Sequence, residues 1–216
     1  MRRLVLILFF VSGCVIGMLW ARSLQDSSKP IYGVLKKLPY APDGWFRNGP
    51  QIAHLIKTHQ VKTVAEVGSW MGRSSILIAS MLPSDGFICC IDHFLGSVEH
   101  QPGQVCHDQR LPYLYHQFLS NVMQSGLKNK IIPLRMASVE AAKAINFQPD
   151  LIYIDASHET KDVYEDLCTW FPIAGDKGLL CGDDWDMPSV RAAVEQFAKE
   201  KHLTVVGQTS FWYFKR

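Results

Sequence analysis

The feature that most constrains the fold is an alternation of short apolar segments and longer helical segments, which begins near residue 51. Strands that are apolar on both faces and are separated by helices form a parallel sheet that helices cover on both sides. The sequence therefore predicts a doubly wound α/β fold. The predicted strands are residues 63–67, 87–91, 131–135, 151–155 and 178–181, and the predicted helices are residues 74–82, 111–125, 138–145, 159–171 and 189–201.

The carboxyl-terminal part of the chain predicts one reversal in this sheet. Two further apolar strands are expected at residues 204–206 and 211–214, and only the short segment 207–210 joins them. A parallel crossover needs a dozen or more residues, so these two strands must pair antiparallel. We therefore expect a seven-stranded, mostly parallel sheet with an antiparallel final strand.

The composition supports a large core and excludes one class of partner. The chain has 216 residues, of which 48% are hydrophobic. It contains 22 Lys and Arg and 20 Asp and Glu. A net charge of +2 gives no general attraction to a phosphate backbone, so nucleic acid is not expected as a partner. The six cysteines form no CxxC pair, which indicates free thiols in a reducing compartment.

The amino-terminal segment predicts a membrane anchor. Residues 4–21 are uncharged and mostly apolar, between Arg3 and Arg22. At about 1.5 Å per residue, a helix of this length would extend about 27 Å, just enough to cross a hydrocarbon core. The alternative is a cleaved signal or an exported lipoprotein, because residues 11–14 resemble a lipoprotein cleavage box.

Three regions follow from these observations. Residues 1–22 are the expected anchor or signal, and residues 23–50, with four prolines, are the expected tether and capping segment. Residues 51–216 form the expected folded domain. Within the capping segment, Trp45 and Phe46 either close a pocket or pack on the domain.

The first predicted strand is followed by a glycine turn that opens a helix. Gly68 and Gly72 allow the backbone to pass close to a ligand, and the free amides at the helix start favour a carboxylate or phosphate. The spacing matches neither the dinucleotide fingerprint nor a P-loop. Asp92 ends the second strand, where a carboxylate can accept hydrogen bonds from both hydroxyls of a ribose. A nucleoside that carries a carboxylate fits both features, whereas a plain turn and a helix cap remain the alternative.

Three carboxylates follow the fourth and fifth strands. If these strands are neighbours, Asp155, Asp183 and Asp184 meet at one edge of the sheet, where they would repel one another. A bound Mg²⁺, Ca²⁺ or Mn²⁺ would relieve this repulsion, since such ions prefer oxygen ligands. The alternative is that Asp155 caps the next helix and the other two end a strand in water. His158 lies near the same helix start and is a candidate general base.

From Gln51 to the carboxyl end, this set of motifs resembles the class I S-adenosylmethionine (SAM)-dependent methyltransferases, of Rossmann-like fold. The resemblance is greatest to small-molecule O-methyltransferases of the catechol and antibiotic-sugar type. It implies that the cofactor lies on Glu66, Gly68, Ser69, Gly72, Ser74, Asp92, Ser138 and Asp155, with Asp92 at the ribose and Ser138 near the adenine. It also implies a magnesium ion on Asp155, Asp183 and Asp184, and Asp184 departs from the asparagine of the catechol enzymes.

The resemblance implies that a small hydroxylated molecule is methylated on oxygen, with Asp155 and His158 as catalytic residues. The polar segment 94–110 is the expected lid. A metal-dependent hydrolase or hydroxylase and a non-catalytic cofactor-binding module are the alternatives. Because SAM is made in the cytosol, the anchor is expected to leave the domain facing the cytosol.

Overall fold

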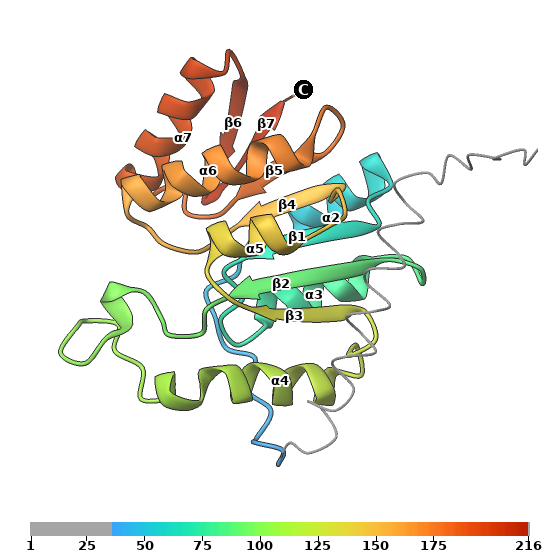
Figure 1. Ribbon diagram of the computed structural model, residues 1–216, viewed down its shortest axis with the longest axis vertical. Coiled ribbons are helices and arrows are strands. Elements are labelled where there is room, and N and C mark those ends of the chain that lie inside the picture. The colour runs from blue at the N-terminus through green and yellow to red at the C-terminus, as the bar shows by residue number, and fades with distance from the viewer. Residues whose placement is uncertain (1–35, 216) are drawn as a thin grey trace, which may run out of the picture.

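The computed structural model describes residues 36–215. These residues contain one seven-stranded sheet with the strand order β3-β2-β1-β4-β5-β7-β6 (Figure 1). The strands β1 to β5 run parallel to one another, and β7 pairs antiparallel with both β5 and β6. The prediction of a mostly parallel Rossmann-like sheet with an antiparallel final strand is confirmed. The strands are β1 (Thr63–Val67), β2 (Phe87–Asp92), β3 (Ile131–Arg135), β4 (Leu151–Ile154), β5 (Leu179–Gly182), β6 (Thr204–Gln208) and β7 (Phe211–Lys215).

Helices cover both faces of the sheet. The apolar side chains of α2, α3 and α4 pack on one face, and those of α5, α6 and α7 pack on the other, which gives two hydrophobic cores. Every residue of the central strand β1 is buried, as expected of a strand covered on both sides. The helices are α2 (Gly49–His59), α3 (Arg73–Met81), α4 (Leu114–Ser125), α5 (Ser138–Ala144), α6 (Thr160–Ala174) and α7 (Pro188–Glu200), and two 3-10 turns are η1 (Val98–His100) and η2 (Leu111–Tyr113).

The edge position of β3 explains a proline within a strand. Pro133 pairs with Cys90 of β2, and no strand lies on the other side of β3 in the described sheet. Proline lacks an amide proton and cannot donate to a second neighbour, so an edge is the position where a strand tolerates it.

Helix α6 continues beyond its predicted end. The sequence predicted a stop at Phe171 because Pro172 follows, but the helix includes Pro172 and ends at Ala174. Proline costs one backbone hydrogen bond, whereas the burial of Trp170 and Ala174 keeps the last turn packed on the sheet. The packing of this last turn on the sheet therefore outweighed the tendency of Pro172 to end the helix.

The predicted membrane anchor requires a correction. No helix in the described residues is both long and apolar enough to cross a membrane. The longest of them, α6, has 15 residues, whereas a span needs about 20. The predicted transmembrane helix and the membrane localisation derived from it are therefore not supported, and the segment on which they were based, residues 4–21, lies outside the described residues.

Candidate active site

The ends of four parallel strands are joined by backbone hydrogen bonds along one rim. The amide of Gly68, after β1, donates to the carbonyl of Ile91 at 2.8 Å. The amide of Asp155, after β4, donates to Val67 at 2.8 Å, and that of Asp183, after β5, donates to Ile154 at 3.1 Å. The turns that carry the candidate site residues are therefore consecutive neighbours in space, as the strand order requires.

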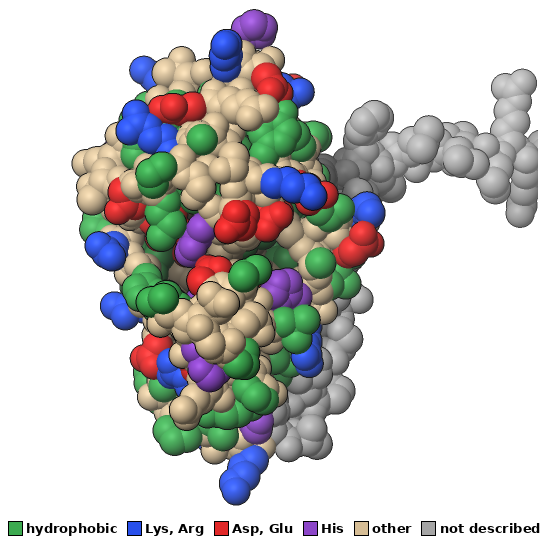
Figure 2. Space-filling model, turned by 90° about the vertical axis from the view of Figure 1, so that its left-hand side faces the viewer, with side chains coloured by type: hydrophobic (Ala, Val, Ile, Leu, Met, Phe, Trp, Pro, Cys, Tyr) green, Lys and Arg blue, Asp and Glu red, His purple; other side chains and the backbone are tan. Residues whose placement is uncertain are grey.

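This rim opens into a cavity of about 520 Å³. Figure 2 shows this side of the molecule, with carboxylates and histidines around a central hollow. Among the candidate residues, the cavity is lined by Gly68, Ser69, Ser74, Asp92, Ser138, Asp155, His158, Asp183 and Asp184. Two further candidates, Glu66 and Gly72, support the glycine turn instead of lining the cavity.

The glycine turn can form only because two of its positions tolerate left-handed backbone. Gly68 has φ +91°, and a Cβ at this position would overlap the backbone carbonyl of Asp155. Gly72 has φ +85° and is the residue from which α3 begins. The turn therefore brings β1 against β4 more closely than any side chain would permit.

Asp92 braces the same turn from the neighbouring strand. Its Oδ2 accepts hydrogen bonds from the amides of Ser69 at 3.1 Å and Trp70 at 2.9 Å, and its Oδ1 accepts one from the amide of Phe94. Trp70 has φ +46°, a costly conformation for a non-glycine residue that these bonds help to hold. This bracing role was not predicted from the sequence, because it depends on the register of β1 and β2.

Glu66 is a completely buried carboxylate beneath the turn. Its Oε2 accepts hydrogen bonds from the hydroxyls of Ser69 at 2.7 Å and Ser75. Burial raises its pKa, although these hydroxyls and that of Ser74 oppose the shift. Its Oε1 is buried with no hydrogen-bond partner among the described residues.

Ser138 lies in a polar network at the other end of the cavity. Its hydroxyl donates to Asp166 of α6 and accepts from the indole nitrogen of Trp170 at 2.8 Å. Burial raises the pKa of Asp166 to about 6. Asp166 also lines the cavity, and the sequence analysis missed it because a carboxylate in the middle of an amphipathic helix carries no motif.

The three carboxylates after β4 and β5 divide into a pair and a single group. Asp155 and Asp183 both lie within hydrogen-bond reach of the Tyr153 hydroxyl, at 3.4 and 3.2 Å. Burial, followed by the negative charges of Asp183 and Asp184, raises the pKa of Asp155 well above its usual range. Asp184 instead places its Oδ2 at 3.0 Å from Nε2 of His158.

His158 bridges two carboxylates from different loops. Its Nδ1 lies 3.3 Å from Oε1 of Glu99 in η1, and its Nε2 faces Asp184. The hydrogen bond to Asp184 raises the pKa of His158, although partial burial opposes the shift. Within residues 36–215, no group of three or more His, Cys, Asp or Glu side chains is arranged to hold a metal ion.

The segment before α2 and the expected lid complete the cavity wall. Trp45 lines the cavity and is exposed, whereas Phe46 is buried and packs edge-on against Tyr153 with ring centroids 5.9 Å apart. Phe46 also lines the cavity, so this residue both packs on the domain and contributes to the cavity wall. From the lid, His100 and Glu99 reach the cavity.

Comparison with known proteins agrees with this architecture. Residues 65–185, more than half of the chain, match a family described as a methyltransferase domain. Similar solved structures include an O-methyltransferase from Bacillus cereus in complex with S-adenosylhomocysteine (SAH), at 16% identity and TM-score 0.56, covering 93% of this chain and 96% of that one.

Two further structures share the fold. The O-methyltransferase TomG from Streptomyces achromogenes, involved in tomaymycin synthesis and in complex with SAM, is 13% identical with TM-score 0.60, covering 90% of this chain and 87% of that one. A methyltransferase from Geobacter sulfurreducens is 13% identical with TM-score 0.57, covering 97% and 92%. The chain belongs to the methyltransferase domain family and is a class I SAM-dependent methyltransferase.

Proposed function

We propose that this enzyme transfers the methyl group of SAM to a hydroxyl oxygen of a small molecule, with the help of a divalent cation. One observation carries the proposal. The turn and acid suited to a nucleoside, Gly68 and Asp92, line the same cavity as the carboxylates Asp155, Asp183 and Asp184. Donor and acceptor can therefore meet within one cavity.

The cofactor would extend along the rim from the glycine turn towards α5. Asp92 would hold the ribose, and Ser138 would lie beside the adenine, where its network with Asp166 supplies polar atoms. The methionine part would lie against the start of α3, whose free amides favour its carboxylate. The proposed cofactor-binding residues are Glu66, Gly68, Ser69, Gly72, Ser74, Asp92, Ser138 and Asp155.

The carboxylate chemistry fits a hard divalent cation such as Mg²⁺. Asp155 and Asp183 face a common point, and their mutual repulsion contributes to the raised pKa of Asp155. A positive ion would relieve that repulsion, and oxygen ligands suit magnesium. Asp155, Asp183 and Asp184 would hold the ion, which lowers the pKa of a bound hydroxyl when present.

In the proposed reaction a bond forms between the acceptor oxygen and the methyl carbon while the bond from that carbon to sulfur breaks. The sulfonium takes up the bonding electron pair and becomes the thioether of SAH, and the hydroxyl proton passes to His158 in its neutral form. Asp155 would orient the acceptor for in-line attack. Glu99 and His100 of the lid would limit the access of water.

The acceptor is proposed to be a small molecule because the site is a cavity of about 520 Å³. O-methyltransferases are among the solved structures that share this fold. We also propose that residues 51–216 form the methyltransferase domain and that residues 23–50, described from residue 36 onward, act as its capping segment.

The proposal is tested by incubating the protein with SAM and a panel of small alcohols, phenols and amines. SAH and methylated product are measured by mass spectrometry, with Mg²⁺ present and after treatment with EDTA. We expect product in the first condition and a large loss in the second. Product formed equally in both would refute the cation, and SAM binding with methylation of nitrogen or carbon instead of oxygen would refute the acceptor class.

A further inference from the structure

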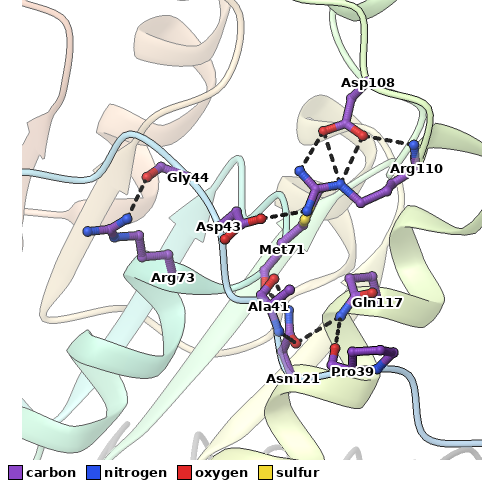
Figure 3. Close-up of polar contacts among 10 residues, drawn as sticks. All are labelled: Pro39, Ala41, Asp43, Gly44, Met71, Arg73, Asp108, Arg110, Gln117 and Asn121. Carbon is purple, nitrogen blue, oxygen red and sulfur yellow. Dashed lines mark hydrogen bonds and ion pairs between the residues drawn. The ribbon is translucent and has the colours of Figure 1, made fainter.

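Asn121 lies within helix α4 and uses every hydrogen-bonding position of its amide. The side chain is completely buried. Its Oδ1 accepts from the amide of Ala41 at 2.9 Å and from Nε2 of Gln117 at 3.0 Å. Its Nδ2 donates to the carbonyls of Ala41 at 2.9 Å and Met71 at 2.8 Å (Figure 3). A buried amide with both donors and both acceptor positions satisfied is held in one orientation.

The bond to Met71 reaches the glycine turn between β1 and α3. The peptide that joins Met71 to Gly72 is held at both ends, because the Gly72 amide donates to the carbonyl of Ser69 at 2.7 Å while the Met71 carbonyl accepts from Asn121. Trp70, with φ +46°, and Gly72, with φ +85°, have left-handed backbone. Since glycine can adopt several backbone conformations, these two hydrogen bonds fix the orientation of the peptide.

Helix α3 begins directly after this peptide. The first amides of a helix have no partner within the helix, and Arg73 and Ser74, at the start of α3, both line the cavity. In the proposed site these amides face the carboxylate of the methionine part of SAM. Asp92 holds the amides of Ser69 and Trp70, so Asn121 acts on a part of the turn that Asp92 does not hold.

The same amide ties the turn to the segment before α2. We call residues 38–47 the strap. Arg73 donates to the carbonyl of Gly44 in the strap at 3.1 Å, and Arg110 of the lid contacts Asp43 at 2.5 Å (Figure 3). Loss of the Asn121 amide would therefore affect the turn and the strap together, so a control variant must loosen the strap alone.

We propose that Asn121 is a positioning residue of the cofactor site, which holds the peptide between Met71 and Gly72 in the orientation that the methionine part of SAM requires. Without this donor the buried carbonyl of Met71 is left unpaired, at a cost that rotation of the peptide would relieve. Such a rotation turns the first amides of α3 away from the cofactor carboxylate. The inference rests on the proposed cofactor site and adds to it a residue of α4 that does not line the cavity.

The test compares two ligands that share the nucleoside and differ in the amino acid end, SAH and 5′-methylthioadenosine. Binding of SAH to the full-length protein is measured by calorimetry, and that of 5′-methylthioadenosine by its competition with SAH. For Asn121→Leu we expect SAH affinity to fall about tenfold and the affinity for 5′-methylthioadenosine to stay within about twofold. Asn121→Asp, which keeps the acceptor oxygen but loses the donor to Met71, should show the same difference. A general loss of structure would weaken both ligands alike.

A matched control is Ser120→Ala on the same helix. The hydroxyl of Ser120, also completely buried, accepts from the amide of Leu38 at 2.9 Å and donates to its carbonyl at 3.1 Å. This variant therefore loses two hydrogen bonds to the strap and none to the turn. It should keep the affinity for both ligands within about twofold.

Hydrogen exchange tests the inference on the wild-type protein, independently of how the variants fold. Residues 38–42 of the strap do not line the cavity, so a ligand can affect them only through neighbouring groups. We expect SAH to slow exchange in this segment about twofold or more, because an ordered turn also orders Asn121, and to leave β6 at the far edge of the sheet unchanged.

The inference is overturned if the two Asn121 variants bind SAH as wild type does, if they weaken both ligands equally, or if Ser120→Ala weakens SAH as strongly. Should both Asn121 variants fail to fold, unchanged exchange in residues 38–42 on SAH binding overturns it. Failure of the wild type to bind SAH would instead refute the proposed cofactor site.

Discussion

The hydroxyl of Tyr153 lies 3.2 Å from Oδ2 of Asp183 and 3.4 Å from Oδ2 of Asp155. Tyr153 is completely buried on β4, and burial raises its pKa well above the usual range, so the phenol stays protonated and can donate. One hydroxyl carries one proton and satisfies one carboxylate at a time. The shared donor thus holds the two acids close together, and the negative charge of Asp183 is one of the causes that raise the pKa of Asp155.

Removal of this shared donor should impair the proposed reaction without unfolding the protein. In Tyr153→Phe the ring still fills its site against Phe46, but the two carboxylates lose the group that aligns them. We expect turnover to fall about tenfold, at unchanged SAM affinity, as measured by SAH formation and calorimetry. Tyr164→Phe, which removes a surface hydroxyl bonded to Glu200, is the control and should retain full turnover. Unchanged turnover in Tyr153→Phe would remove this residue from the site.

Substitutions at two aspartates should affect SAM affinity and turnover separately. Asp92→Asn should weaken SAM affinity about tenfold or more, because the glycine turn loses a charged acceptor and the ribose loses its carboxylate. Asp155→Asn should keep SAM affinity within about threefold and lose nearly all turnover. Calorimetry and an endpoint SAH assay measure the two effects. An equal loss of both properties in each variant would contradict the division.

The glycine turn should be intolerant of a single added methyl group. Gly68→Ala places a Cβ against the Asp155 carbonyl at a left-handed φ, and we expect the free energy of unfolding to fall by about 3–5 kcal/mol. Gly103→Ala is a matched control, since Gly103 has φ +87° but open space around its Cβ. It should cost only about 1 kcal/mol. Denaturant unfolding measures both, and similar losses would mean that the close approach of β1 and β4 is unimportant.

Asp166 should make stability depend on pH. Its pKa rises to about 6 in the folded state, against 3.8 for the unperturbed group, so the folded state binds the proton more tightly. Its contribution to stability is therefore fully present below about pH 4 and is lost as pH rises to about 6. Asp166→Asn should flatten the unfolding free energy over this range, whereas Asp176→Asn, which removes an exposed carboxylate beyond the end of α6, should retain the wild-type slope. A wild-type slope in Asp166→Asn would show that Asp166 is not the titrating group.

The sheet could be predicted from local patterns because a short apolar run indicates each strand. The last two strands were expected to pair antiparallel because the predicted link between them has only four residues. The edge at which ligands bind also follows from strand direction, so Asp92, Asp155, Asp183 and Asp184 could be singled out without coordinates. The predicted stop at Pro172 was wrong, because a local breaker competes there with the packing of Trp170.

The sequence by itself therefore determined the fold class, the ligand-binding edge and the acids placed on it, since these depend on periodicity and chain direction. Only the tertiary structure decided which groups meet: Tyr153 between two aspartates, His158 on Asp184, and Trp45 over the cavity. Each of these contacts joins segments that are distant in the chain or depends on side-chain direction. No local pattern encodes such a distance, because it is set by the packing of the whole domain.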